Sequence, residues 1–225
     1  MPLDDREEAG RFVDLERWPR ASAYRFFLEY EQPFFNICTE VDVTATWRYC
    51  RERGVSYFLA SWYLCLRACN ETEPLRYRLR EEGVWEHERL FMGTTVAMED
   101  RSFRFGYFDW AEDFGSFRRG AELALERVRD PSKPLEDLFD RDDLIHGSVL
   151  PWVRFTSIVH ARRLPAKDSV PKIVLGKCSE LDADTVSMPI SIEAHHALVD
   201  GIDIADCLRR FEEGLAEPER SLAEI

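Results

Sequence analysis

The segment that most constrains the fold spans residues 190–201, with the sequence ISIEAHHALVDG. Apolar residues alternate with polar ones through 190–194, which predicts a strand, and residues 201–213 predict a helix after it. The strand therefore delivers His195 and His196 to a turn that ends in Asp-Gly, where a glycine permits backbone geometry that a side chain would forbid. Histidine is the side chain most easily poised to accept a proton near neutral pH, so this turn is a candidate site for a general base.

Strands and helices alternate along the rest of the chain. Helices are expected over residues 15–30, 44–53, 57–70, 111–129 and 201–213. Strands are expected over residues 34–43, 91–98, 103–109, 152–161, 172–177 and 186–195, with a hairpin over 77–86. Because hairpins occur beside the alternating elements, the pattern predicts an α/β two-layer sandwich, a mixed β-sheet covered by helices. Pro189 interrupts the last strand, which predicts an edge or irregular position for that strand.

The charge and hydropathy of the chain exclude several classes of function. The 225 residues carry a formal net charge of −13, and an acidic chain is a poor match for nucleic acid or an anionic membrane surface. No stretch approaches the roughly 20 apolar residues that a membrane-spanning helix needs, and residues 1–11 lack the apolar core of a signal peptide. We therefore expect no nucleic-acid partner, no membrane partner and a cytoplasmic location.

The cysteines favour a reducing compartment. The chain has six of them and no CxxC pair, so we expect free thiols packed mostly in the core. Cys65 and Cys69 are four residues apart on one expected helix face. Because no matching His or Cys pair accompanies them, no metal site is expected.

Three blocks of sequence resemble one known family. Residues 195–201 (HHALVDG) match the HHxxxDG signature of the chloramphenicol acetyltransferase family. Residues 12–20 (FVDLERWPR) resemble the N-terminal segment of that family, which contains Trp-x-Arg. Residues 148–157 (SVLPWVRFTS) resemble the family's strand that begins Ser-x-x-Pro-Trp. The resemblance covers almost the whole chain. It implies one domain over residues 1–225 with a two-layer α/β fold, assembled as a homotrimer whose active sites lie between neighbouring subunits. It also implies acetyl-coenzyme A as co-substrate, with no permanently bound cofactor, and a hydroxyl of chloramphenicol or a related small molecule as acceptor.

The resemblance assigns roles to individual residues. His196 corresponds to the catalytic base, and Ser148 corresponds to the group that stabilises the oxyanion of the tetrahedral intermediate. Asp200 is tempting as the acid of a catalytic triad, but in the family the matching residue pairs with the Arg of Trp-x-Arg, here Arg20, and holds the active-site backbone in shape. His195 is expected to be structural.

The resemblance also indicates residues that contact the substrates. The family's acceptor pocket, or the core beside it, is lined at the positions of Phe103 and Phe27, and also at those of Phe26 and Phe155. The expected coenzyme tunnel lies near Trp152 and Lys177. The chain departs from the drug-acetylating members at four positions: Phe27 for a tyrosine, Val174 for a threonine, Ser56 for a lysine and Cys178 for an aromatic residue.

These departures leave open which acceptor the protein uses and whether it is catalytically active. A site that lacks a hydrogen-bond partner can lose several powers of ten against a substrate that needs it, so the acceptor can differ from chloramphenicol and coenzyme affinity can be weak. One alternative is a catalytically silent, ligand-binding relative, which the thinned coenzyme contacts favour and His196 and Ser148 oppose. The other is the catalytic core of a dihydrolipoyl acyltransferase, which shares the HxxxDG turn and the trimeric plan.

Overall fold

A mixed β-sheet forms the centre of the molecule. The computed structural model describes residues 9–130, 132, 141–162 and 168–223. Within them, seven strands form one sheet in the order β2-β10-β8-β7-β5-β6, with β9 added on β10. The strands are β2 (Phe34–Asp42), β5 (Phe91–Ala97), β6 (Phe103–Phe108), β7 (Leu144–Val149), β8 (Lys172–Leu175), β9 (Ser179–Glu180) and β10 (Val186–His195). Strand β7 is parallel to β5 and β8, and the other pairs are antiparallel, so the predicted mixed sheet is confirmed.

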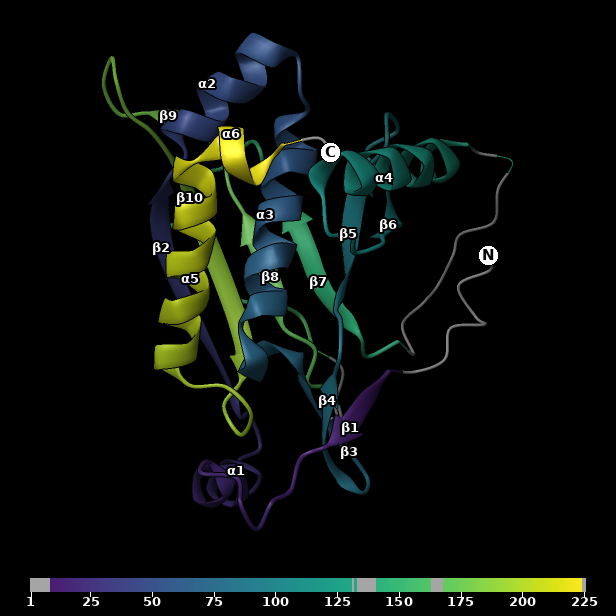
Figure 1. The fold of residues 1–225 in the computed structure, drawn as a ribbon, viewed down its shortest axis with the longest axis vertical. Helices are drawn as coiled ribbons and strands as arrows, with labels where there is room; N and C mark the ends of the chain where they lie inside the picture. Colours follow the sequence, from purple (N-terminus) through teal and green to yellow (C-terminus); the bar gives the residue numbers. More distant parts are fainter. Residues whose placement is uncertain (1–8, 131, 133–140, 163–167, 224–225) are drawn as a thin grey trace.

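Helices cover one face of this sheet, as Figure 1 shows for α5, α3 and α4. The helices are α2 (Thr44–Arg53), α3 (Tyr57–Glu71), α4 (Phe114–Arg129), α5 (Gly201–Ala216) and the short α6 (Pro218–Ser221). Helix α3 lies directly on the sheet, because a Cβ added to Gly147 of β7 would lie 2.7 Å from the ring of Trp62. The predicted two-layer α/β architecture is therefore confirmed. None of the described helices is long and apolar enough to cross a bilayer.

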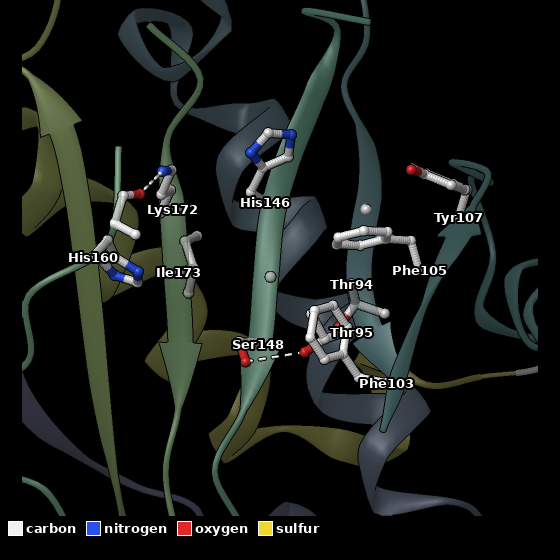
Figure 2. A pocket seen from close by; sticks show the side chains of 13 residues that line it. Thr94, Thr95, Phe103, Phe105, Tyr107, His146, Ser148, His160, Lys172 and Ile173 are labelled. Carbon is white, nitrogen blue, oxygen red and sulfur yellow. Dashed lines mark hydrogen bonds between the residues drawn. The ribbon is translucent and has the colours of Figure 1, made fainter. Parts of the chain in front are cut away.

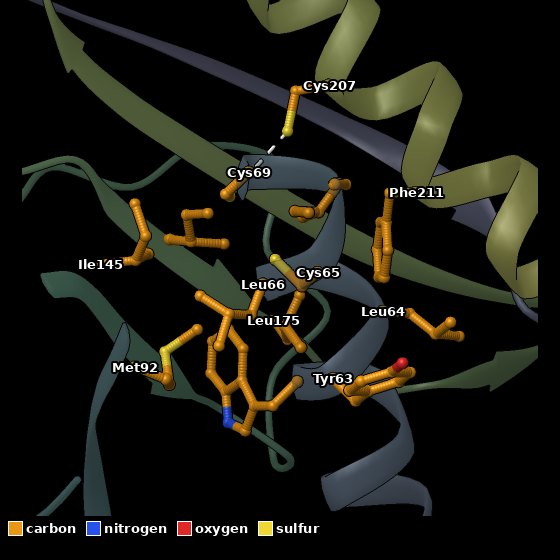
Figure 3. Close-up of a cluster of buried hydrophobic side chains, with 14 of the residues drawn as sticks. Tyr63, Leu64, Cys65, Leu66, Cys69, Met92, Ile145, Leu175, Cys207 and Phe211 are labelled. Atoms are coloured by element: carbon orange, nitrogen blue, oxygen red, sulfur yellow. Dashed lines mark hydrogen bonds between the residues drawn. The ribbon is translucent and has the colours of Figure 1, made fainter. Parts of the chain in front are cut away.

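The core lies between these helices and the sheet (Figure 3). Helix α3 supplies Leu66 and Cys69, which pack against Leu175 of β8 and Phe211 of α5 in one buried cluster. All six cysteines are free thiols, and Cys50, Cys65, Cys69 and Cys207 are buried, as the sequence predicted. Burying apolar surface at about 25 cal/mol per Å² is the main favourable term that holds the two layers together.

A second, smaller sheet holds the N-terminal segment in place. Its strands are β1 (Gly10–Phe12), β4 (Gly83–His87) and β3 (Tyr77–Arg80), in the order β1-β4-β3, and the 3₁₀ turn η2 (Glu73–Arg76) precedes β3. The predicted hairpin is thus confirmed and gains a third strand. In Figure 1 this sheet lies at the lower end of the main sheet, near α1 (Ala21–Phe27).

The prediction of a strand over residues 152–161 is wrong. Strand β7 lies just before this segment, and residues 154–162 instead cross the sheet face that the helices leave uncovered. Side chains of the sheet hold the crossing segment: Asn36 Nδ2 donates to the Ile158 carbonyl at 2.7 Å, and Lys172 Nζ donates to the Ala161 carbonyl at 2.7 Å. The run is β-like in composition, but its backbone has no strand partner at the sheet edge.

Two other expectations need correction. The helix predicted over residues 15–30 is only Ala21–Phe27, because turns occupy the residues before it. The edge position predicted for the strand that holds Pro189 is wrong, because β10 is an interior and fully buried strand, but the predicted irregular position is confirmed. The Pro189 carbonyl accepts a hydrogen bond from Gly176 N–H at 2.8 Å, so its missing N–H faces the break between β8 and β9, where no ladder bond is lost.

Candidate active site

The turn after β10 fixes the ring of His196. Its backbone N–H donates to the Pro33 carbonyl at 2.7 Å, and its Nδ1 lies 3.2 Å from the Val199 carbonyl. The ring stacks on Phe27, with centroids 3.9 Å apart and planes 10° apart, and it also contacts Phe35 at 4.5 Å. A carbonyl oxygen can only accept, and this contact is shorter than the 3.5 Å from Arg20 Nη2 to the same Nδ1, so it favours a proton on Nδ1 and leaves Nε2 as the basic nitrogen. In this arrangement Nε2 of His196 can accept a proton.

An ion pair ties the N-terminal segment to this turn. Arg20 Nη1 lies 2.7 Å from Asp200 Oδ2, and Arg20 Nη2 donates to the carbonyls of His196 and of Val199, the latter at 2.9 Å. The bond from Arg20 holds the pKa of Asp200 below its usual value. Asp200 is also the N-cap residue of α5, where its Oδ1 accepts from Gly201 N–H at 2.8 Å. The pair thus holds the turn in place, and among the described residues no hydrogen bond joins the Asp200 carboxylate to the imidazole of His196.

Ser148 lies on the sheet face opposite the helices. Its neighbour Gly147 points at Trp62 of α3, and successive side chains of a strand point to opposite faces. The Oγ of Ser148 is 3.1 Å from Thr95 Oγ1 on β5. If Thr95 donates in this bond, the hydroxyl hydrogen of Ser148 remains available for a developing oxyanion.

A pocket of about 350 Å³ opens beside Ser148 (Figure 2). Its lining comes from β5, β6, β7, β8 and the crossing segment: Gly93, Thr94, Thr95, Phe103, Phe105, Tyr107, His146, Gly147, Ser148, His160, Ala161, Lys172 and Ile173. Burial lowers the pKa of His146 to about 4, so this imidazole is neutral at neutral pH. The sequence did not identify His146, His160 or Lys172 as site residues. His146 could have been found from the alternation of β7, which places it on the same face as Ser148.

Ser148 and His196 form two separate half-sites in one chain. Ser148 is in register with Val174 of β8, Val174 is in register with Ser191 of β10, and His196 follows Ser191 by five residues. Two strand spacings across the sheet correspond to roughly 10 Å, and five residues along β10 correspond to roughly 17 Å. The straight-line separation of the two residues is therefore about 19 Å. We call the two regions the Ser148 half-site and the His196 half-site.

The other predicted residues divide between these half-sites. Phe103 is 59% exposed and lines the Ser148 pocket, whereas Phe27 stacks on His196. Trp152 is 70% exposed in the turn after β7, and the N–H of Lys177 donates to the carbonyl of Val153 at 3.0 Å. The two predicted coenzyme residues therefore lie beside each other at the end of β7 and β8.

Three of the departures from the family have a visible place in the fold. Ser56 is the N-cap of α3, and its side chain accepts from the N–H of Leu59 at 3.4 Å. Val174 is buried in register with Ser148, so it offers a methyl surface where a threonine would offer a hydroxyl. Cys178 is half-buried between β8 and β9.

Comparison with known proteins identifies the family of the chain. The family model described as chloramphenicol acetyltransferase matches residues 10–212. A chloramphenicol acetyltransferase of Streptomyces acrimycini is 28% identical over 217 residues, which cover 92% of this chain and 94% of that protein. Chloramphenicol acetyltransferase 3 of Escherichia coli is 22% identical over 203 residues, covering 89% of this chain and 94% of that protein.

Solved structures give the same result for the fold. A chloramphenicol acetyltransferase structure superposes with a TM-score of 0.84 at 26% identity, covering 91% of this chain and 98% of that one. A dihydrolipoamide acetyltransferase of Azotobacter vinelandii superposes with a TM-score of 0.60 at 17% identity, covering 97% of this chain and 94% of that one. The second likeness concerns the fold alone.

Proposed function

We propose that this chain, which belongs to the chloramphenicol acetyltransferase family and is an acyltransferase of that type, transfers the acetyl group of acetyl-coenzyme A to a hydroxyl of chloramphenicol or of a related small molecule. The observation that carries the proposal is the contact of His196 Nδ1 with the Val199 carbonyl. It directs Nε2 away from the protein backbone as a base for the acceptor. Such a base has no evident purpose in a protein that only binds ligands.

The proposed reaction uses one base and one oxyanion donor. His196 Nε2 takes the proton of the acceptor hydroxyl while the oxygen attacks the thioester carbonyl carbon. The resulting oxyanion accepts a hydrogen bond from Ser148, and a preplaced donor of this kind is worth about 2.7–4 kcal/mol in the transition state. The C–S bond then breaks, and the proton held by His196 passes to the departing coenzyme A sulfur.

The separation of the half-sites supports an active site shared between two copies of the chain. Reacting atoms must approach to about 3–3.5 Å, whereas Ser148 and His196 of one chain are about 19 Å apart. A neighbouring copy can supply the missing half, which fits a cyclic homotrimer with three identical sites. Large apolar side chains stand exposed near both half-sites, among them Phe26, Phe103 and Trp152. Burying them between subunits would remove this apolar surface from water.

A thiol-release assay with acetyl-coenzyme A and a panel of acceptors tests the proposal. The panel includes chloramphenicol, other small alcohols and reduced dihydrolipoamide. Release of coenzyme A that depends on an alcohol supports O-acetyl transfer, and mass spectrometry of the product identifies the ester. Release with dihydrolipoamide alone would favour an acyltransferase core of the dihydrolipoyl type. No release with any acceptor, despite calorimetric binding of coenzyme A, would indicate a silent relative.

A further inference from the structure

The pocket of the Ser148 half-site has two chemically different walls. One row of register partners crosses the sheet through Tyr107, Gly93, His146 and Lys172. Gly93 has no side chain, so the phenol ring of Tyr107 lies close over its backbone, 3.3 Å from where a Cβ would stand, and Tyr107, Gly93, His146 and Lys172 all line the hollow of the pocket. Figure 2 shows aromatic rings from β6 along one side of the hollow and nitrogen-bearing side chains along the other.

Lys172 brings a cation to the polar wall. Its side chain is 15% exposed, its Nζ donates to the Ala161 carbonyl at 2.7 Å, and the Asp168 carboxylate is 3.9 Å away. That carboxylate lies closer to Arg162, at 3.1 Å, and Arg162 also holds Glu193 at 2.6 Å. An ammonium has three N–H donors, and among the described residues only the Ala161 carbonyl lies within hydrogen-bond distance of Nζ.

Two imidazoles add further donors beside Lys172. His146 is the register partner of Lys172, and His160, from the crossing segment, lies on the other side of Lys172 in the same wall of the pocket (Figure 2). The Nε2 of His160 is buried and has no hydrogen-bond partner among the described residues. A buried nitrogen without a partner costs free energy, so a ligand that satisfies it gains affinity.

We propose that Lys172, His146 and His160 form an anion-binding wall that selects acceptors carrying a carboxylate or a similar anionic oxygen group. The inference rests on the proposed function, because Ser148 marks where the acceptor hydroxyl meets the thioester. His146 precedes Ser148 by two residues on β7, so the polar wall lies about 7 Å along the strand from the reaction centre. The acceptor therefore has an apolar body against the β6 rings, its hydroxyl at Ser148 and its anionic group at the remote end.

Lys172 favours an anion over a neutral polar group because the two nearby carboxylates, Asp168 and Glu193, lie closer to Arg162 than to its ammonium. Burial and the nearby Arg162 lower the pKa of Lys172, and a bound carboxylate would compensate both effects. Hydrogen bonds to charged groups are stronger than those between neutral groups, at about 1.5–3 kcal/mol each. A neutral ester of the same shape keeps the apolar contacts and loses the charge-assisted bonds.

Thiol release with a matched pair of acceptors tests this inference. The pair is 4-(hydroxymethyl)benzoate and its methyl ester, which carry the hydroxyl and the anionic or neutral group at opposite ends of one aromatic ring. We expect the acid to exceed the ester in kcat/KM by about tenfold to a hundredfold. Lys172→Met should abolish this preference, and Lys172→Arg should retain most of it.

The controls separate the two proposals. Arg154→Met removes a surface cation that pairs with Glu40 outside the pocket, so it should leave the acid-to-ester ratio unchanged. If alcohols are acetylated but the ratio is near one, or if Lys172→Met leaves the ratio intact, the anion-binding wall is wrong and the proposed function stands. If no alcohol is acetylated, the proposed function fails. Calorimetric titration of the acid and the ester into wild-type protein and Lys172→Met then decides the inference by binding alone.

Discussion

At the scale of the residue, the proposed chemistry depends on one imidazole held by a backbone carbonyl. The Val199 carbonyl and the stacked ring of Phe27 together fix the orientation of His196. A small turn can therefore present a base without a carboxylate partner on the imidazole. Asp200, the residue that a triad reading would choose, instead faces Arg20.

His196→Ala is expected to remove nearly all acetyl transfer while coenzyme A still binds. General-base catalysis contributes about 10²–10⁴-fold, so the loss should fall on kcat. Steady-state thiol release measures it, and calorimetry with coenzyme A measures binding. His195→Asn is the matched control, since an asparagine oxygen can replace the His195 Nδ1 that accepts from the Ala197 N–H. Full activity of the His196 variant would end this mechanism, and loss of coenzyme binding by a folded variant would make His196 a binding determinant.

Thr95 is expected to act as a positioning residue for the Ser148 hydroxyl. Ser148→Ala should lower kcat, by less than His196→Ala if water or a backbone donor partly replaces the hydroxyl. Thr95→Val removes the 3.1 Å partner of Ser148 at almost constant volume, so kcat should fall while the KM for the acceptor changes little. Thr95→Ser should restore the rate. Equal kcat for Thr95→Val and wild type would show that Ser148 needs no such partner.

At the scale of the element, Asp200 serves helix α5 and the ion pair at once. Asn is as good an N-cap as Asp, so Asp200→Asn should lose mainly the charge of the ion pair. Asp200→Ala should also lose the cap, which should lower the free energy of unfolding by about a further 0.5–2 kcal/mol. The side chain of Asp200 is 46% exposed, so we expect the pair to contribute less than the roughly 3–5 kcal/mol typical of a broken buried pair.

Thermal unfolding, measured together with steady-state kinetics, tests the loss of the ion-pair charge and the loss of the helix cap. The order of stability should be wild type, then Asp200→Asn, then Asp200→Ala. The kcat of Asp200→Asn should fall less than that of His196→Ala. An unchanged melting temperature together with an abolished turnover would instead place Asp200 in the proton transfer.

At the scale of the whole molecule, the half-sites predict that activity needs more than one chain. We expect sedimentation to give a homotrimer. Mixing His196→Ala with Ser148→Ala subunits, after unfolding and refolding them together, should restore activity to about a quarter of the sites, because some interfaces then combine an intact His196 with an intact Ser148. A fully active monomer, or a mixture as inactive as its components, would rule out the shared site.

Acid should destabilise the fold in a window set by two histidines, the buried His195 and the half-buried His146. Burial lowers the pKa of both His146 and His195 from 6.5 to about 4. Between these values the unfolded chain binds protons that the folded chain does not, so the free energy of unfolding falls as the pH drops from about 6.5 to 4. Each group contributes on the order of 3 kcal/mol to this fall. Denaturant titrations across this range check it, and His195→Asn should flatten the slope.

The sequence by itself determined the parts of the fold that local patterns control. The apolar helix α3, the Gly54 that ends α2 with a φ of 65°, and the strand, turn and helix around His196 were all predicted within a few residues. Each follows from side-chain periodicity or from the conformational freedom of glycine, which need no distant partner. The family also followed from the sequence, because three short motifs in it resemble those of the family.

Only the tertiary structure decided the features that depend on strand pairing. Residues 152–161 are β-like in composition but lie across the open face of the sheet. Pro189 is tolerated in the interior strand β10 because its missing N–H faces the break between β8 and β9. His146 and Lys172 become neighbours through the register of β7 and β8. The same register sets Ser148 and His196 about 19 Å apart. Register is a property of two or more strands together, so a single run of sequence cannot specify it.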